Sequence, residues 1–366
     1  MRIVWYSEVK WNYLRTRKQN LLAHFPPNDK ILFFQPFSFV NKNFIFPRKE
    51  ENVYYVTLPT YRKSKFKTFD KLMSFSIFRI FFYIVLKCYA NFWIRILLKK
   101  TPDCICISNI YYLSLINNNK TPIVWDFNDH PGQFGAQPSW AIQEFNRFIN
   151  DTDNSIISSS IGITNYLNKE YNRLVNTIPN GVDLGKFNNN LSKDNLSPIP
   201  VIGYVGIISP WFFDFELVQK LAKHFNSCEI QLYGPRVIDI ENQLDQLLQI
   251  PNISYHGEKP YDILPQIMNT FTVGIIPLYS TPEVRRLASG KFLQYLGVGI
   301  PVVSVWMDQY AKIEKNIFLS NTHSEFISSV EKALKHPFIP MNDDLREFDW
   351  KNLSKYFRNE LKAAIR

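Results

Sequence analysis

The second half of the chain reads VIGYVG at residues 201–206, EIQLYG at 229–234, ISYHG at 253–257, VGIIP at 273–277, PVVSV at 301–305 and NIFL at 316–319. Helix-length segments separate these short apolar runs. Nearly continuous apolar strands that alternate with helices are typical of a parallel sheet covered on both faces. This stretch therefore predicts a doubly wound α/β domain.

A similar series of apolar runs precedes it: RIVWY at residues 2–6, ILFFQ at 31–35, VYYVTL at 53–58, CICIS at 104–108, PIVWDF at 122–127 and SIIS at 155–158. A polar stretch from Asn188 to Pro200 separates the two series and is interpreted as an interdomain linker. Because 366 residues exceed the usual size of one core, we expect two α/β domains. Two such domains place their ligands at the carboxyl ends of their strands, facing one cleft.

The positive charge is concentrated in the first third of the chain. Residues 1–120 carry 20 Lys and Arg against 6 Asp and Glu, a net charge of +14, and the remaining residues carry −4. Such asymmetry indicates that the partner is a nucleic acid, an anionic membrane surface or an acidic substrate. The alternative is that the charge only keeps the protein soluble. We expect no nucleic acid, because the aromatic positions match no RNA-binding motif.

The segment from Tyr61 to Lys100 is aromatic, apolar and basic at once. Arg79, Lys87 and Arg95 interrupt it, which argues against a transmembrane helix. Interfacial helices combine Lys and Arg with Phe, Trp and Leu in this way. The segment therefore predicts membrane contact, with a helix pair buried in the N-terminal domain as the alternative.

The cysteines and the N-terminus bear on the compartment. Cys88, Cys104, Cys106 and Cys228 have no metal-ligand spacing and are interpreted as reduced core residues. The N-terminal MRIVWYSEVK lacks the apolar region of a secretory signal. We therefore expect a cytoplasmic protein, peripheral on the inner face of the cell membrane.

The stretch STPEVRRLASGKFLQYLGVGIPVVS, residues 280–304, holds the strongest candidate site. Lys291 and Gln294 lie three apart, on one face of a helix expected to begin near Ser289 and Gly290. The unpaired N–H groups of a helix start suit a pyrophosphate, Lys291 adds a charge, and Gln294 can bond ribose hydroxyls. The alternative for Lys291 is an ordinary solvated lysine in the first turn.

This stretch resembles retaining glycosyltransferases of family 4, and especially the teichuronic-acid-type sugar transferases near them. Their pattern K-x-x-E-Y-x-x-x-G-x-P-V-V matches at Lys291, Tyr295, Gly299, Pro301, Val302 and Val303. The resemblance implies the GT-B fold, donor phosphate at Lys291 and the nucleotide ribose at position 294. Gln294 departs from the pattern, since the family has Glu there, and an amide lacks the charge that strengthens a carboxylate–hydroxyl bond.

Further fragments resemble the same family in the same order. IGYVGIISPWFFDFELVQKLA at 202–222 looks like the first strand, turn and helix of its C-terminal domain, IPNGVDLGKF at 178–187 like its interdomain connection, and WNYLRTRKQNLLAHF at 11–25 like its first N-terminal helix. LYGP and YHGEKPYDILP resemble its nucleobase pocket. The remaining donor-binding candidates are Gly206, Gly234, Tyr255, Gly257, Tyr261, Leu264, Arg285 and Arg286. Each of these residues has an alternative interpretation. The tyrosines would be core or rim aromatics, the arginines would be surface residues, and Gly206 would simply end a strand.

The predicted strand end WDFNDHPGQFG, residues 125–135, brings Asp126, Asp129 and His130 together as candidate catalytic residues. One of them could be the general base for the acceptor hydroxyl, with Asp126 as the first choice, and His130 could contact the donor. The alternative is that an aspartate here is an ordinary cap in a turn at the end of the strand. Acceptor-binding candidates are Lys10, Trp11 and Arg17. No metal-binding or Walker motif is present, so the predicted mechanism uses fixed charges and no metal.

These observations predict a GT-B glycosyltransferase that moves a hexose from a nucleotide sugar, a UDP-sugar, to a glycan or lipid-linked acceptor in bacterial-type surface polysaccharide synthesis. The predicted domains are 1–190 with the C-terminal helix 350–366, which binds acceptor, and 196–349, which binds donor. One alternative is a nucleotide-sugar epimerase of the same fold. The other is an inactive homologue that acts as a scaffold.

Overall fold

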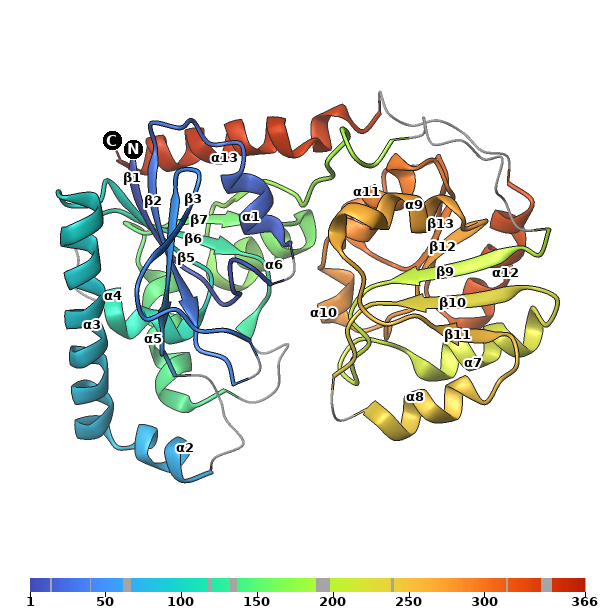
Figure 1. Cartoon of the computed structure of the whole chain (residues 1–366), viewed down its shortest axis with the longest axis horizontal. Coiled ribbons are helices and arrows are strands. Elements are labelled where there is room, and N and C mark those ends of the chain that lie inside the picture. The colour runs from blue at the N-terminus through green and yellow to red at the C-terminus, as the bar shows by residue number, and fades with distance from the viewer. Residues whose placement is uncertain are drawn as a thin grey trace. The chain divides into compact units, whose positions relative to one another are not determined.

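The computed structural model describes residues 1–13, 15–39, 41–61, 67–116, 120–131, 137–188, 198–237, 240–313, 315–336 and 344–365. The chain forms two compact units (Figure 1). The first unit comprises Met1–Ser159, Ile163–Ile178 and Ser354–Arg366, and the second comprises Ser160–Gly162 and Pro179–Leu353. The sequence placed the boundaries at 190, 196 and 350. Most of the predicted linker, residues 189–197, lies outside the described residues.

The first unit contains an eight-stranded sheet in the order β3-β4-β2-β1-β5-β6-β7-β8. Its strands are β1 (Arg2–Tyr6), β2 (Lys30–Pro36), β3 (Arg48–Glu50), β4 (Val53–Leu58), β5 (Cys104–Ile107), β6 (Ile123–Phe127), β7 (Ser155–Ser158) and β8 (Asn176–Thr177). Its helices are α1 (Arg17–Leu22), α2 (Lys67–Ser74), α3 (Ser76–Leu98), α4 (Leu113–Ile116), α5 (Ser139–Asn150), α6 (Ile161–Tyr171) and most of α13 (Trp350–Ile365). All strand pairs are parallel except β3 with β4.

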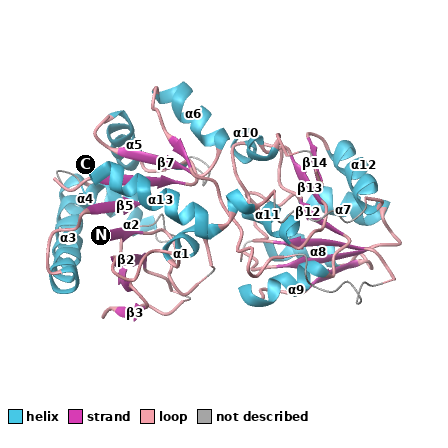
Figure 2. Ribbon diagram, turned by 90° about the horizontal axis from the view of Figure 1, so that it is seen from above, coloured by secondary structure: helices cyan, strands magenta, loops and turns pink. Residues whose placement is uncertain are grey.

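The second unit contains a six-stranded parallel sheet in the order β11-β10-β9-β12-β13-β14. Its strands are β9 (Val201–Val205), β10 (Glu229–Tyr233), β11 (Ile253–Tyr255), β12 (Val273–Ile276), β13 (Val302–Val305) and β14 (Ile317–Ser320). Its helices are α7 (Phe215–His224), α8 (Glu241–Leu248), α9 (Leu264–Asn269), α10 (Pro282–Arg285), α11 (Gly290–Gly297) and α12 (His323–Leu334). This is the strand order of a dinucleotide-binding fold, with its reversal between β9 and β12. Figure 2 shows helices on both faces of the strands.

The twelve apolar runs of the sequence all form strands, which confirms the predicted α/β class. The sequence missed β3 and β8. The three residues of β3, Arg48–Glu50, are charged and exposed, and β8 has only two residues. An exposed edge strand buries nothing, so it leaves no apolar pattern for a sequence to show.

Opposite faces of the first sheet are covered by α3 and α13. Val4 and Tyr6 point into the core shared with α3, where Tyr83, Leu86 and other residues are buried. On the other face, the Trp5 ring stacks on Phe357 of α13 at 5.6 Å between centroids. The alternating side chains of β1 thus hold the two helices on opposite sides of one strand.

Two glycines decide how α11 sits on the second sheet. Gly203 of β9 and Gly274 of β12 are register partners, and neither has a side chain above the sheet. A Cβ atom on Gly274 would lie 2.6 Å from the Tyr295 ring, and one on Gly203 would lie 2.1 Å from the Phe271 ring. The Tyr295 hydroxyl also accepts a hydrogen bond from the Val205 N–H at 2.8 Å. The motif residue Tyr295 therefore anchors α11 across the point where the strand order reverses.

The cysteines follow the prediction at three positions of four. Cys104, Cys106 and Cys228 are buried free thiols. Cys88 is exposed on α3, which corrects its interpretation as a core residue. The helix turns that position away from the sheet.

We expect Gly274→Ala to lower the free energy of unfolding by about 1–3 kcal/mol, the usual cost of overpacking, because the new methyl group meets the Tyr295 ring. Gly290→Ala is the matched control, since its Cβ would meet nothing nearer than 3.9 Å. Urea denaturation of both variants measures the difference. Equal stability of the two variants would contradict this account of how α11 is held.

Candidate functional site

The reversal of strand order between β9 and β12 is where an open α/β sheet binds its ligand, at the carboxyl ends of the strands. Gly206 follows β9 at this edge, and the chain after β12 passes through α10 into α11. The helix begins at Gly290 with Ser289 as its N-cap, as the sequence predicted, and no side chain caps it. The Phe292 N–H donates to the Ser289 carbonyl at 3.2 Å, which leaves the N–H groups of Gly290 and Lys291 as the ones suited to a ligand.

Lys291 and Gln294 share one face of α11, as their spacing predicted. The Lys291 ammonium donates a hydrogen bond to the Gln294 Oε1 at 3.0 Å. Gln294 is buried, whereas Lys291 is half-buried. The amide thus holds the ammonium over the first turn of the helix.

Burial lowers the pKa of Lys291 from 10.5 to about 8. No carboxylate is among the causes of this shift, which is due to desolvation alone. A partly buried cation whose partner is neutral is stabilised when an anion binds and compensates its charge. The position therefore suits a phosphate group.

A glycine follows each of three neighbouring strands at this edge: Gly206 after β9, Gly234 after β10 and Gly257 after β11. The Gly234 N–H donates to the Gly257 carbonyl at 2.9 Å, and a Cβ on Gly234 would lie 1.9 Å from the Gly206 carbonyl oxygen. Gly234 and Gly257 also have positive φ angles, +134° and +68°. The glycines let three strand ends lie close together and keep side chains off the edge.

The other predicted base-pocket residues lie near the same edge, and each has internal contacts. The Tyr255 hydroxyl donates to the Gly234 carbonyl at 2.8 Å. The Tyr261 ring packs edge-on against Phe187, with the Lys186 ammonium 5.5 Å from its centroid. Leu264 is buried in the core at the start of α9. Tyr255 and Tyr261 keep the two strand-end loops in place, and Leu264, 7% exposed, offers a ligand little surface.

Of the two arginines, Arg285 is the more exposed. Its Nε atom donates to Asp308 at 3.0 Å and its guanidinium lies 5.3 Å from the Trp306 ring centroid. Arg286 is half-buried at the C-cap of α10. Trp306 and Asp308 were missed by the sequence analysis, although both follow β13 at the same edge of the sheet.

Asn180 is a second missed residue. Its amide donates to the Ala288 carbonyl at 2.6 Å, and its Cβ lies 4.0 Å from the position of a Cβ on Gly290. The motif IPNGVDLGKF, interpreted as an interdomain connection, thus also packs against the start of α11. An Asn before a Gly after a short strand was the available signal.

In the first unit, Asp126 forms a buried ion pair. Its Oδ1 accepts from the Arg17 Nε at 2.9 Å, and the exposed fractions of the two side chains are 0% and 4%. Asn128 donates to its other oxygen at 3.3 Å. Because a general base must touch its substrate, this burial argues against Asp126 as the base and gives it the role of anchoring α1 to β6.

Asp129 is more accessible than Asp126 and remains a candidate base. It is half-buried just beyond β6, and its pKa is raised to about 6, mainly by desolvation and further by the carboxylates of Glu8 and Asp126. Glu8, which follows β1, pairs with Lys18 of α1 at 2.5 Å and accepts a hydrogen bond from Ser108, which follows β5. Strand order reverses between β1 and β5, so this network occupies the ligand edge of the first sheet. Glu8, Lys18 and Ser108 are not among the residues predicted from the sequence, although Glu8 and Ser108 lie within two residues of a strand end.

His130 is half-buried between aromatic side chains. Its Nε2 lies 3.1 Å from the Tyr166 hydroxyl, and its ring packs edge-on against Tyr166 and Phe145. These contacts fix the orientation of the ring. Among the described residues, no three His, Cys, Asp or Glu side chains form a metal-binding group.

The predicted acceptor residues are all buried. The Lys10 ammonium donates to the Asn41 and Lys42 carbonyls and to Asn43, and the Trp11 indole donates to Glu50 at 2.9 Å. Arg17 pairs with Asp126. Lys10, Trp11 and Arg17 therefore fix the loops after β1 and β2, and burial argues against direct contact with an acceptor.

Comparison with known proteins gives one related sequence and many related structures. No family model matches the chain. Over 213 residues it is 26% identical to TuaH of Bacillus subtilis, described as a glycosyltransferase of teichuronic acid biosynthesis. The match covers 53% of both chains, so this chain spans about half the length of its curated relative.

The structural matches cover the whole fold. Sucrose-phosphate synthase from Thermosynechococcus elongatus matches with a TM-score of 0.73 and 13% identity over 99% of both chains. HepE of Anabaena, solved with UDP and glucose, matches with a TM-score of 0.71 and 14% identity over 99% of this chain and 100% of its own. These similarities confirm the GT-B fold and the resemblance to GT-B glycosyltransferases that the motifs predicted.

The two aspartates should respond oppositely to loss of charge. We expect Asp126→Asn to cost about 3–5 kcal/mol of stability, because buried Arg17 loses its counter-ion. Asp129→Asn should stabilise the protein at pH 7 by up to about 3 kcal/mol, since the pKa is raised from 3.8 to about 6 and each pKa unit is worth ~1.4 kcal/mol. The sign follows from the raised pKa of Asp129: stability is lost as pH rises from 3.8 to about 6, where the folded carboxyl ionises.

Thermal melting at pH 4 and pH 7 measures both effects. Asp129→Asn should gain stability relative to the parent protein only at the higher pH. If both variants lose stability equally at pH 7, the two carboxylates do not have different environments.

Proposed function

We propose that this GT-B chain is a glycosyltransferase that moves a hexose from a UDP-sugar to a glycan or lipid-linked acceptor in the synthesis of a surface polysaccharide. The UDP-sugar is supported by HepE, a similar structure solved with UDP and glucose. The polysaccharide is supported by the sequence match to TuaH, described as acting in teichuronic acid biosynthesis. The proposed site of action is the inner face of the cell membrane.

The observation that carries the proposal is the geometry at Lys291. Its half-buried ammonium lies at the uncapped start of α11, beside the point where the strand order reverses. Its partner is the neutral Gln294. A diphosphate placed there would meet helix N–H groups and an uncompensated cation, which is the environment that stabilises a departing nucleoside diphosphate.

The first unit supplies the acceptor side of the reaction. Asp129, with its pKa near 6, is ionised at neutral pH and can take the proton of an acceptor hydroxyl. Lys18 and Ser108 hold Glu8 next to it, and the Glu8 charge raises the proton affinity of Asp129. In this proposal the fixed charge of Lys291 serves the leaving group, and we expect transfer to persist in EDTA.

Lys291→Met should abolish most donor binding and transfer, with a loss of roughly 3 kcal/mol, the usual cost of removing one charge-stabilising donor. The control is Lys312→Met, which removes an exposed lysine elsewhere in the second unit. A thermal-shift screen of nucleotide sugars first identifies the donor, because a ligand at 100 times its Kd adds about 2.7 kcal/mol of stability. Product analysis then separates transfer from epimerisation.

The pH dependence of donor binding tests the same group. A bound diphosphate favours the charged lysine, so affinity should be constant below pH 7 and fall above pH 8, where the pKa of free Lys291 lies. Titration calorimetry of the parent protein should show proton uptake at pH 8.5 that Lys291→Met lacks. Normal affinity in Lys291→Met would contradict the proposed site.

Gln294 offers a test that leaves Lys291 in place. Gln294→Ala should weaken donor binding by roughly 1 kcal/mol, the net value of a hydrogen bond. Gln294→Glu should form an ion pair with Lys291, raise its pKa and move the fall in donor affinity to higher pH. Calorimetry across pH 6 to 10 measures both. If the alanine variant binds donor normally, position 294 lies outside the site.

A further inference from the structure

The outer face of α3 is apolar and has no protein partner among the described residues. The helix packs on the sheet through Tyr83, Leu86, Ala90, Ile94 and Leu98, which are spaced three and four apart. At 100° per residue the opposite face holds Ile77, Phe81, Ile84, Val85, Cys88, Phe92, Arg95 and Ile96. The exposed fractions of Ile77, Phe81 and Phe92 are 84%, 65% and 53%.

A neighbouring loop extends this surface. The Tyr89 hydroxyl donates to the Ile45 carbonyl at 2.8 Å, and the Phe46 ring packs edge-on against Trp93 at 6.2 Å. The side chains of Ile45 and Phe46 are themselves 70% and 74% exposed. We call the exposed apolar side chains of the helix, together with Ile45 and Phe46, the α3 face. A monomeric soluble protein seldom leaves such a continuous apolar surface uncovered.

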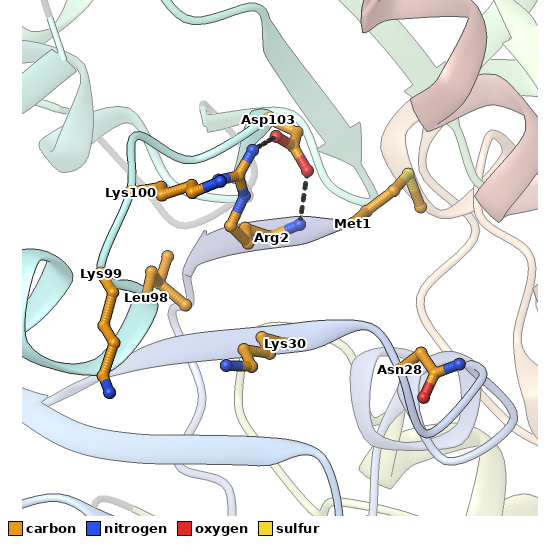
Figure 3. A pocket seen from close by; sticks show the side chains of 8 residues that line it. All are labelled: Met1, Arg2, Asn28, Lys30, Leu98, Lys99, Lys100 and Asp103. Atoms are coloured by element: carbon orange, nitrogen blue, oxygen red, sulfur yellow. Dashed lines mark hydrogen bonds and ion pairs between the residues drawn. The ribbon is translucent and has the colours of Figure 1, made fainter.

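Cations lie at both ends of this face. Arg95 lies on it, and Lys99 and Lys100 follow the C-terminal end of α3. There they join Arg2 and Lys30 around a hollow of about 350 Å³, in which Asp103 is the one acidic residue and is already paired with Arg2 (Figure 3). At the other end, α2 contributes exposed Lys67 and Lys71. The helix α3 itself contains no acidic residue.

The three cations of the helix, Arg79, Lys87 and Arg95, do not lie along one face of it. Arg79 turns back to the Met73 carbonyl and the Trp140 ring, and Lys87 is half-buried beside the inner row. Only Arg95 lies among the apolar side chains of the outer face. By length and composition alone, the helix is long and apolar enough to cross a membrane in spite of these charges. Its inner row is nevertheless packed against the sheet.

We propose that the α3 face docks in the plane of an anionic membrane, with Ile77, Phe81, Ile84, Phe92 and Phe46 among the acyl chains and the lysines at both ends among lipid headgroups. Apolar side chains bordered by cations are the pattern of interfacial helices. A second copy of this chain fits less well, because two cationic borders would face each other across a symmetric interface.

The orientation of α3 relates this surface to the ligand edge. The helix leads from α2, which follows the carboxyl end of β4, back to Asp103 at the amino end of β5, so it runs antiparallel to the strands. Its 23 residues are about 35 Å long at 1.5 Å per residue. The α2 end of the docked helix therefore lies at the edge that carries Asp129. This step rests on the proposed function and favours a lipid-linked acceptor over a free glycan.

Flotation of the full chain with vesicles tests the docking. The parent protein should bind phosphatidylcholine vesicles containing 30% phosphatidylglycerol and be released by salt near 0.5 M, where the electrostatic reach is only a few ångström. Phe81→Gln with Phe92→Gln should weaken binding at least tenfold. The matched control, Leu174→Gln with Ile199→Gln, removes two exposed apolar side chains away from α3 and should bind as the parent does.

The cationic border has its own pair of variants. Lys99→Gln with Lys100→Gln should weaken binding about fivefold per lysine. The control, Lys332→Gln with Lys335→Gln, changes exposed lysines at the end of α12 and at its C-cap and should have little effect. Sedimentation without vesicles identifies a dimer through the same face. Equal binding of the Phe81/Phe92 and control variants, or a dimer that those substitutions dissolve, would overturn the proposal. Calorimetry with the donor on the same samples reports the donor site separately.

Discussion

The candidate donor site depends on the contact between the Tyr295 ring and Gly274. Because β9 and β12 each place a glycine at the same level, the sheet has a depression where its strand order reverses. Tyr295 fills it and bonds to β9, which fixes the start of α11 one turn earlier at the carboxyl edge. The position of Lys291 is thus set by packing on the sheet, and a ligand need not order the helix.

Burial moves the two candidate reacting groups in opposite directions along the pH scale. It lowers the pKa of Lys291 to about 8 and raises that of Asp129 to about 6, since both groups lose water that would stabilise their charge. Asp126, only three residues from Asp129, is more deeply buried yet has Arg17 as counter-ion. A charge that the fold satisfies is structural, and a charge that it leaves unsatisfied is available to substrate.

The sequence predicted elements that bury apolar side chains and missed contacts made across distant segments. The strands and the start of α11 could be predicted because hydrophobic periodicity and helix-start signals depend only on residues close together in the sequence. The burial of Asp126 could not be predicted because its partner, Arg17, lies 109 residues earlier, and no local pattern reveals an ion pair of that kind. Glu8 and Ser108 could have been found, since both follow strands flanking the reversal in strand order.

The α3 helix shows how one segment can satisfy two environments. Its inner row stabilises the sheet through ordinary burial, so the helix would form in water without any membrane. Its outer face then exposes apolar side chains that contribute nothing to folding in water and favour self-association. Lysines at both ends add charge that opposes pairing of two such faces and attracts an anionic surface. In the proposed docking, the same cations keep the helix face free of a second copy and attract it to an anionic membrane.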